Sequence, residues 1–510
     1  MNVDETSELR AEQPAVPALD EIPLFVESVE ETQAGSSPVT RRALQSYGAF
    51  RREELRAATL PLPTAELNWA TVVQLRRRAS EEIAGKSEHQ LRTTGSPVAG
   101  DDRLLLGRSI IRRVVAEHVR TLHREGAALW SPAQEQAYVE AVEDAVFGYG
   151  RLQPLLALPD VENIEIHGWD SVVVQLGDGR REVMAPVADD DAELVEAIRF
   201  LGQNAEPARP FDDLHPTMTL ALGERFRLHA IGFGLSYRPS VVIRQHTMTS
   251  VSLADLAEGG LMPAEVAAFL DAAVLARRSV VISGDQGAGK TTLLRALIDA
   301  IPANERFGTL ETDYELMTHL QPGRQNILAL QARVGHGEAS GGRAVGEFTI
   351  ADLMPEALRQ NLSRLVVGEV RGSEAASMFE AMQAGTGTLS TTHSHSASST
   401  IDRLASRVAQ GGVLSVEEAY RQIAHNIHLF VHVRLVDDTW RGGRRRRFVS
   451  EIRQVVGAME NGRPVTHLTY SAEGAAGQPA GFFPDAGFAA ELAPFRRELR
   501  SHRPAGGEGR

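Results

Sequence analysis

The segment Gly-Asp-Gln-Gly-Ala-Gly-Lys-Thr-Thr at residues 284–292 constrains this chain more than any other feature. It follows Ser-Val-Val-Ile-Ser at 279–283, a β-branched run typical of a buried strand, and precedes the helix-forming stretch Leu-Leu-Arg-Ala-Leu at 293–297. A strand, a loop of the form Gly-x-x-x-x-Gly-Lys-Thr and a helix, in this order, are typical of a phosphate-binding loop. Glycines let such a loop turn its N–H groups toward phosphate oxygens, and the helix N-terminus adds a partial positive charge there. We therefore expect a nucleoside triphosphate to bind here.

Two side chains of this loop have expected roles of their own. Lys290 can reach the β- and γ-phosphates, and the hydroxyl of Thr291 can hold Mg²⁺. The expected cofactors are therefore ATP and Mg²⁺. The residues predicted to bind the nucleotide are Gly284, Gly287, Ala288, Gly289, Lys290, Thr291 and Thr292.

Composition limits the class of protein. A chain of 510 residues has a prior of two or three domains, and 43% hydrophobic with 24% charged residues is the composition of a soluble globular protein. The chain has no cysteine, which excludes disulfides and thiolate metal sites. It has no apolar run of about 18 residues and no signal-peptide pattern at its start, so we expect a cytoplasmic location. A net charge of −14 argues against a general nucleic-acid coat protein.

The charge is spread unevenly along the chain. Residues 1–40 hold nine acidic side chains and one arginine, whereas residues 441–447 read Arg-Gly-Gly-Arg-Arg-Arg-Arg. One interpretation of the basic cluster is a solvated turn between two strands. The other is contact with anionic lipid headgroups or an acidic partner. The sequence leaves both open.

The hydrophobic pattern changes several times along the chain. A Pro-, Glu-, Ser- and Thr-rich start is followed by a helical pattern, then by short period-two segments, and finally by alternating strands and helices. The predicted boundaries are a mostly disordered acidic tail at 1–65, a helical N-terminal region at 66–150, an α+β domain at 151–250, a linker at 251–262, a nucleotide-binding domain at 263–470 and a flexible C-terminal tail at 471–510.

Three further segments of the last domain carry candidate catalytic groups. The apolar run Leu365–Val367 leads to Glu369, which suits a group that orients Mg²⁺-bound water, although a buried strand can also end in glutamate by chance. Residues 309–316 carry three carboxylates that can serve as a general base or that contribute only surface acidity. The small-residue stretch 385–393 ends in His393, which can contact a γ-phosphate or be structural.

The order of these motifs resembles the ATPases of type II and type IV secretion systems. The resemblance covers about residues 105–470. Within these ATPases, the motifs are most similar to those of the CpaF-like ATPases of tight-adherence (Flp-type) pilus assembly. It implies an α/β fold class: a C-terminal RecA-like P-loop NTPase domain with a parallel-rich sheet, preceded by a smaller α+β domain and an N-terminal helical region. Residues 150–168 are similar to the start of that family's N-terminal domain.

The resemblance also implies site residues. In such rings, arginines of the N-terminal domain reach the nucleotide phosphates, and here Arg227 and Arg244 fit that role better than Arg209; Asp212 also falls where the family places polar residues. The acidic segment reads Glu311-Thr312 where the family has Glu-Asp, so we expect Glu315, assisted by Glu369, to activate water. Glu369 is also expected to hold Mg²⁺ through a water. The catalytic residues implied are Glu315, Glu369, Lys290, His393, Arg227 and Arg244.

The implied function is a hexameric, ATP-hydrolysing motor that powers pilus assembly or protein secretion from the cytoplasmic side. Its partners would be further copies of itself and a polytopic inner-membrane platform protein, through which it associates with the membrane, with no stable nucleic-acid partner. Alternatives are a type II or conjugative type IV secretion ATPase, a DNA-stimulated nucleic-acid motor, and a scaffold that binds ATP without turnover. The absence of cysteine argues against type II export ATPases, which commonly carry a four-cysteine zinc module.

Overall fold

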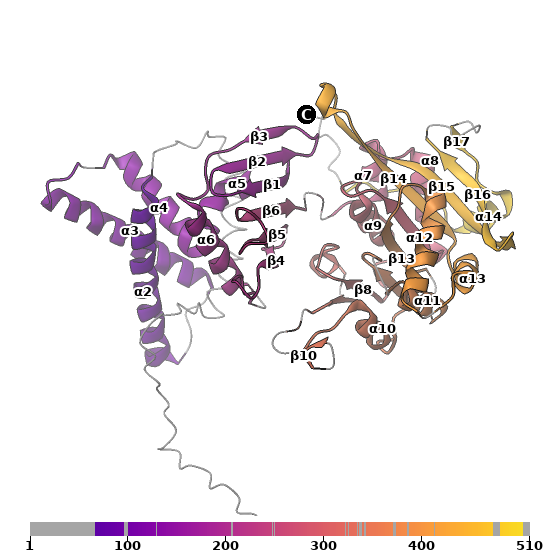
Figure 1. Ribbon diagram of the computed structural model, residues 1–510, viewed down its shortest axis with the longest axis horizontal. Helices are drawn as coiled ribbons and strands as arrows, with labels where there is room; N and C mark the ends of the chain where they lie inside the picture. The colour runs from indigo at the N-terminus through magenta and orange to yellow at the C-terminus, as the bar shows by residue number, and fades with distance from the viewer. Residues whose placement is uncertain are drawn as a thin grey trace, which may run out of the picture.

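Three structural units follow one another along the long axis of the molecule (Figure 1). The computed structural model describes residues 67–502 except 96–99, 129, 206–207, 247, 249, 322, 325, 334, 336–338, 341–342, 371–373, 385–386, 413 and 473–479. The predicted tail at 1–65 lies outside the described residues, as do residues 371 and 372 of the segment Gly-Glu-Val-Arg-Gly at 368–372 that contains Glu369.

The N-terminal unit is a bundle of three helices, which confirms the predicted helical region. The helices bury a shared core of Val, Ile and Leu side chains together with Phe147. The last helix begins in a capping box, in which the Ser131 hydroxyl accepts from the N–H of Gln134 and the Gln134 side chain accepts from the N–H of Ser131. The helices are α2 (Trp69–Thr94), α3 (Gly100–Arg124) and α4 (Pro132–Phe147).

The middle unit is a six-stranded antiparallel sheet in the order β3-β2-β1-β6-β5-β4. One face packs against α6 and buries alternate residues of every strand except β3, whose three residues are exposed. The other face carries the intervening residues, among them Arg227 and Arg244, which are opposite each other in the β5–β6 register. The elements are α5 (Gln153–Ala157), β1 (Val161–His167), β2 (Ser171–Leu176), β3 (Arg181–Val183), α6 (Asp191–Gln203), β4 (Thr217–Leu222), β5 (Phe226–Ile231) and β6 (Ser240–Gln245).

The C-terminal domain is built on a nine-stranded sheet in the order β17-β16-β15-β14-β7-β13-β12-β8-β9. The six strands from β14 to β9 pair in parallel, and β14 to β17 form an antiparallel extension. Its strands are β7 (Val280–Gly284), β8 (Phe307–Glu311), β9 (Ile327–Gln331), β12 (Arg364–Val367), β13 (Leu389–His393), β14 (Leu429–Asp437), β15 (Arg445–Glu460), β16 (Arg463–Ser471) and β17 (Gly481–Phe482), with a separate two-residue pair of β10 (Ala339–Ser340) and β11 (Arg343–Ala344).

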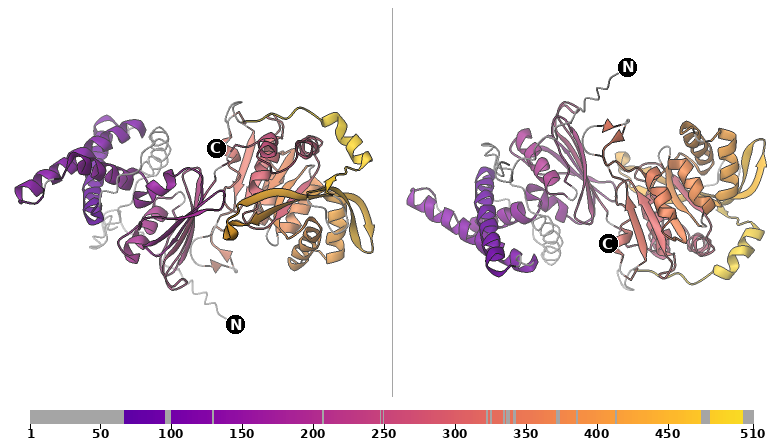
Figure 2. Two further views of the ribbon diagram at one scale, coloured as in Figure 1. Left: turned by 90° about the horizontal axis from the view of Figure 1, so that it is seen from above. Right: turned by 90° about the horizontal axis from the view of Figure 1, so that it is seen from below.

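Helices cover both faces of this sheet, as the two views in Figure 2 show. Val280 and Ile282 of β7 point into one apolar core and Val281 into the other, because successive side chains of a strand alternate between faces. The first core lies under α7 (Leu253–Glu258), α8 (Ala264–Leu275), α9 (Lys290–Asp299) and α14 (Ala486–Leu492). The second lies under α10 (Ile350–Leu358), α11 (Glu374–Ala384), α12 (Ala397–Gln410) and α13 (Val416–Asn426). These sheets confirm the predicted α/β fold class.

The predicted linker at 251–262 is not a free connection. Its apolar side chains are buried in the first core of the C-terminal domain, and α7 occupies half of it. Gly259 and Gly260 end that helix, since Gly260 has φ +79° and Leu261 N–H donates to the carbonyl oxygen of Leu256. The connection between the two sheets is therefore shorter and lies between Gln245 and Val251.

The predicted flexible tail at 471–510 is wrong for residues 480–502. Gly481–Phe482 pairs with β16, and α14 buries Phe488 and Leu492, which are 6% and 1% exposed. The ring of Phe488 lies 6.0 Å from that of Phe269 on α8. The Gly-, Ala- and Pro-rich composition concealed a short apolar helix that completes the core.

Truncating Leu492 to Ala tests this packing. We expect Leu492→Ala to lower the free energy of unfolding of the C-terminal domain by about 3 kcal/mol, because a buried leucine is replaced by a cavity. Urea titration of the full chain measures the change. Phe495→Ala is the control, since Phe495 is 40% exposed. An equal effect of the two changes would contradict the assignment of α14 to the core.

Candidate functional site

The candidate site lies where the parallel strands of the C-terminal sheet end. His393, the last residue of β13, is in register with Gly284 at the end of β7, and Leu310 of β8 is in register with Val367 of β12. The carboxyl ends of parallel strands meet at one edge, so the phosphate loop, Glu311, Glu369 and His393 are brought together there. Gly284 and His393, the first and last of these residues, are more than a hundred residues apart in the chain.

The phosphate loop has the strand–loop–helix geometry that its sequence predicts. Gly284, Gly287 and Gly289 have φ of +153°, +74° and +96°. A Cβ on Gly284 would lie 2.2 Å from the carbonyl oxygen of Val433, so only glycine fits there. The helix α9 begins at Lys290, directly after this loop, so the helix N-terminus adjoins the loop.

Lys290 is buried under its own loop. It is 8% exposed, and its Nζ donates to the carbonyl oxygens of Gly284 at 3.1 Å and Asp285 at 2.9 Å. The same Nζ lies 3.3 Å from Nδ1 of His393. The ammonium is thus held by acceptors at the position where anionic oxygens of a nucleotide can replace them.

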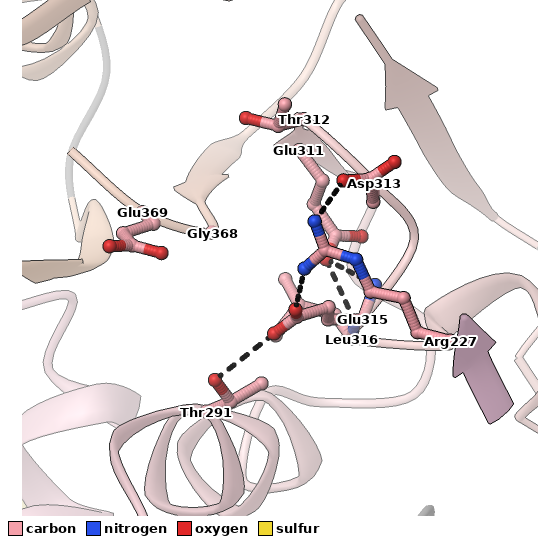
Figure 3. A pocket seen from close by; sticks show the side chains of 9 residues that line it. All are labelled: Arg227, Thr291, Glu311, Thr312, Asp313, Glu315, Leu316, Gly368 and Glu369. Carbon is pink, nitrogen blue, oxygen red and sulfur yellow. Dashed lines mark hydrogen bonds and ion pairs between the residues drawn. The ribbon is translucent and has the colours of Figure 1, made fainter. Parts of the chain in front are cut away.

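Arg227 of the α+β domain reaches into the acidic segment of the C-terminal domain. It donates to Oδ2 of Asp313 and to Oε1 of Glu315, both at 2.6 Å. The other Glu315 oxygen, Oε2, accepts from the hydroxyl of Thr291 at 3.5 Å. Figure 3 shows Arg227 between the two carboxylates, with Thr291 on α9 beyond them. All of these side chains are partly buried, so their charges are only partly screened by water.

The positive charges around Glu315 keep it ionised. Burial raises the pKa of Glu315, but the charges of Arg244 and Arg227 lower it, and the net shift is downward. Burial and the nearby arginines in turn lower the pKa of His246 to about 4, so this imidazole is neutral near pH 7. The predicted pair Arg227 and Arg244 therefore acts on the predicted Glu315 in this structure.

Glu311 differs from Glu315 in environment. It is 3% exposed, and its Oε1 accepts from the N–H groups of Glu315 and Leu316 at 3.0 and 2.8 Å. Burial raises the pKa of Glu311 to about 7. Glu311 therefore braces the backbone of the acidic segment, while Glu315 presents its carboxylate to the phosphate loop.

Glu369 and His393 form a pair at the ends of β12 and β13, which lie between β7 and β8 in the sheet. Nε2 of His393 lies 2.8 Å from Oε1 of Glu369. The end of β12 is fixed against β13 because the Thr391 hydroxyl donates to the carbonyl oxygen of Gly368 at 2.7 Å. Through His393, this pair is connected to Lys290. Figure 3 shows Glu369 across the pocket from Arg227.

Most of the predicted site residues lie together, and two lie elsewhere. The Nδ1 atom of His215 lies 2.9 Å from the Asp212 carboxylate, in the loop before β4, and Arg209 lies in the same loop, where its N–H donates to the carbonyl oxygen of Gly202. Ala288 is buried in the phosphate loop and Thr292 lies one residue beyond Thr291 on α9. The residues that line the pocket are Arg227, Thr291, Glu311, Thr312, Asp313, Glu315, Leu316, Gly368 and Glu369.

Arg295 is the main site residue that the sequence reasoning missed. It is 3% exposed, and it donates to the carbonyl oxygens of Glu315 and, at 2.9 Å, of Met248 in the connection between the domains. Burial lowers the pKa of Arg295 to about 10. The sequence could have predicted its place at the site. Arg295 follows Thr291 by one helical turn, and that spacing puts both side chains on one face of α9.

The site offers oxygen ligands that suit Mg²⁺, but not a complete set. The Thr291 hydroxyl and the carboxylates of Glu315 and Glu369 are hard oxygen donors. Within the described part of the chain, no group of His, Asp and Glu side chains gathers closely enough to hold a metal ion by itself. Mg²⁺ is commonly bound by one or two protein oxygens together with substrate phosphates, and the residues present fit that arrangement.

Among the helices of the described segments, not one is both long and apolar enough to cross a bilayer.

Comparison with known proteins gives one family. A family model described as type II/IV secretion system protein matches residues 181–469. A Mycobacterium tuberculosis protein named for conjugal transfer is 32% identical over 336 residues, which cover 64% of this chain and 90% of that protein. The type IV secretion system protein VirB11 of Brucella suis is 25% identical over 328 residues, which cover 59% of this chain and 88% of that protein. Among solved structures, the pilus retraction motor PilT with bound ADP has a TM-score of 0.39 and 18% identity, and the match covers 57% of this chain and 78% of that chain.

The buried Glu311 makes the stability of the domain depend on pH. Its pKa is raised from 4.5 to about 7 on folding, so its contribution is complete below pH 4.5 and is lost as the pH rises through about 7. The loss is at most about 3 kcal/mol. Glu311→Gln cannot ionise, and its oxygen can still accept from the two backbone N–H groups.

We therefore expect the midpoint of thermal unfolding of Glu311→Gln, relative to the unchanged chain, to be higher at about pH 8 than at about pH 5. Circular dichroism at both pH values measures it. A relative midpoint that does not change with pH would contradict the raised pKa.

Proposed function

Because this chain belongs to the type II/IV secretion system protein family, we propose that it is an ATP-hydrolysing motor that powers protein secretion or pilus assembly. The observation that carries the proposal is the meeting of two domains at the phosphate loop. The loop and the carboxylates belong to the C-terminal domain, while Arg227 enters from the α+β domain. A site divided in this way couples the state of a nucleotide to the relative position of the domains.

The phosphate loop is proposed to bind the β- and γ-phosphates through its N–H groups and Lys290. Lys290 now donates to two loop carbonyl oxygens, which are weaker partners than phosphate oxygens. Binding would exchange these acceptors for phosphate without moving the helix. His393, which lies beside Lys290, is placed to contact the same phosphate group.

Glu315 is proposed to orient the attacking water, with Glu369 assisting. Its carboxylate is held ionised by arginines, so it can accept a proton or a hydrogen bond from water. When bound, Mg²⁺ would neutralise charge on the phosphates, held by the Thr291 hydroxyl and, through water, by Glu369. Because the reaction needs little covalent chemistry, positioning by these side chains accounts for most of the catalysis.

Arg227 and Arg244 are proposed to exchange partners during the cycle. Arg227 is held by Asp313 and Glu315 in this structure, and a γ-phosphate beside Glu315 would compete for the same guanidinium. Moving Arg227 moves the sheet that carries it. The short connection between Gln245 and Val251 then serves as the hinge.

We further propose that the chain is a CpaF-like motor of tight-adherence pilus assembly. Support comes from the order of motifs. The relative named for conjugal transfer, of which the match covers 90%, is instead named for the alternative, conjugative secretion. In this proposal the motor is a hexamer at the cytoplasmic face of the membrane, and it acts on a polytopic inner-membrane platform protein.

Replacing Lys290 with alanine tests the nucleotide site. We expect Lys290→Ala to lower ATP turnover by roughly a hundredfold or more, because the phosphate charge loses its main positive partner. A phosphate-release assay on the purified full chain measures turnover, and circular dichroism checks the fold. Lys86→Ala, at an exposed position on α2, is the control. Unchanged turnover of Lys290→Ala would overturn the site assignment.

Replacing Glu315 with glutamine tests water activation. We expect Glu315→Gln to bind ATP but hydrolyse it roughly a hundredfold more slowly, so that bound nucleotide remains ATP. Filter binding followed by chromatography of the bound nucleotide distinguishes ATP from ADP. Glu356→Gln, on the exposed side of α10, is the matched control. Normal hydrolysis by Glu315→Gln would remove this residue from the catalytic set.

A further inference from the structure

The hairpin of β14 and β15 makes a second contact between the domains, on the opposite side of the phosphate loop from Arg227. Arg447 on β15 is the centre of this contact. Its Nε donates to the carbonyl oxygen of Gly287 in the phosphate loop at 2.8 Å. Its Nη2 lies 2.8 Å from both carboxylate oxygens of Glu162 on β1 of the α+β domain. One guanidinium therefore joins the loop to the other domain.

Neighbouring contacts hold Arg447 in place. Its Nη1 donates to the carbonyl oxygen of Gly177 at 3.2 Å, in the turn after β2. The N–H of Arg445 donates to the carbonyl oxygen of Asp178 at 3.0 Å in the same turn. A Cβ on Gly179 would lie 2.7 Å from Cγ of Arg445, so the hairpin and the turn pack closely.

The arginines of the basic cluster at 441–447 differ in exposure and in the groups that they face. Arg447 and Arg445 are 23% and 16% exposed and face carboxylates, whereas Arg446 is 64% exposed and lies 4.0 Å from Asp438 of its own hairpin. The cluster is thus a hairpin end with two inward arginines. Only the outward ones remain as surface charge.

We propose that Arg447 is a positioning residue for ATP, which fixes the phosphate loop against the α+β domain through Glu162. This rests on the proposed function, since it concerns the same nucleotide. The bonded Gly287 oxygen belongs to the backbone of the loop, so Arg447 sets the direction of the N–H groups that receive phosphate. Arg227 has its own contact with Asp313 and Glu315, which does not depend on Arg447.

The contact bears on binding of ATP more than on bond cleavage. Arg447 bonds to Gly287, Gly177 and Glu162, which are distinct from Glu315, Glu369 and Thr291. Loss of the contact loosens the phosphate loop and the α+β domain, and both changes weaken the binding of ATP. The three nitrogens of the planar guanidinium reach three separate partners in fixed directions, which the single nitrogen of an ammonium cannot match.

The experiment compares Arg447→Gln, Arg447→Lys and Glu162→Gln with the control Arg446→Gln, all in the full chain. ATP affinity is measured by isothermal titration calorimetry, and KM and kcat by phosphate release. We expect Arg447→Gln and Glu162→Gln each to weaken ATP binding and raise KM roughly tenfold with kcat within about twofold, the coupling usual for contacting charged groups. Arg447→Lys should restore part of the affinity, and Arg446→Gln should leave it unchanged.

The double variant Arg447→Gln/Glu162→Gln decides whether the two residues act together. We expect it to bind ATP no more weakly than either single variant. Additive losses, or a loss only in Arg447→Gln, would overturn the role of Glu162. A fall in thermal midpoint with unchanged ATP affinity in Arg447→Gln and Arg447→Lys would show a merely structural contact. If the unchanged chain binds ATP without hydrolysing it, the proposed function fails, and the affinities still test Arg447.

Discussion

The parallel pairing of β7 with strands on both sides is the constraint on which the rest of the site depends. Gly284 at its end is in register with His393 of β13 and with Val433 of β14. The first register brings the histidine to Lys290. The second leaves no space for a side chain at Gly284 and leads directly into the hairpin that carries Arg447. A slip of one residue would reverse the faces of every strand and separate these groups.

The α+β domain is thus held at two sides of the phosphate loop. On one side, Arg227 of that domain meets carboxylates of the C-terminal domain. On the other, Glu162 of that domain meets Arg447 of the C-terminal domain. The α+β domain supplies the arginine of the first contact and the carboxylate of the second, so a nucleotide affects the two contacts differently. Added phosphate charge competes for the arginine of the first contact, whereas the second can persist and act as a pivot.

The sequence predicted the parts of the site that depend on local chemistry. The phosphate loop, Glu369 and His393 lie together because each ends or follows a strand whose pattern was readable. Glu315 and Arg227 were expected from the resemblance to secretion ATPases. The sequence did not predict Arg295 or Glu162, because their partners are backbone oxygens or side chains far away in the chain. It also mistook 251–262 for a linker and 480–502 for a flexible end. In both segments the glycines predict turns or loops. The few apolar residues beside them become buried only through tertiary packing.

The charges of the site explain why an enzyme of this design needs its second domain. Glu315 lies close to the hydroxyl of Thr291, in a partly buried place that disfavours an ionised carboxylate. Arg227 and Arg244, both from the α+β domain, reverse that preference. The second domain therefore supplies the counter-charges that keep the carboxylate proposed to activate water in its ionised form.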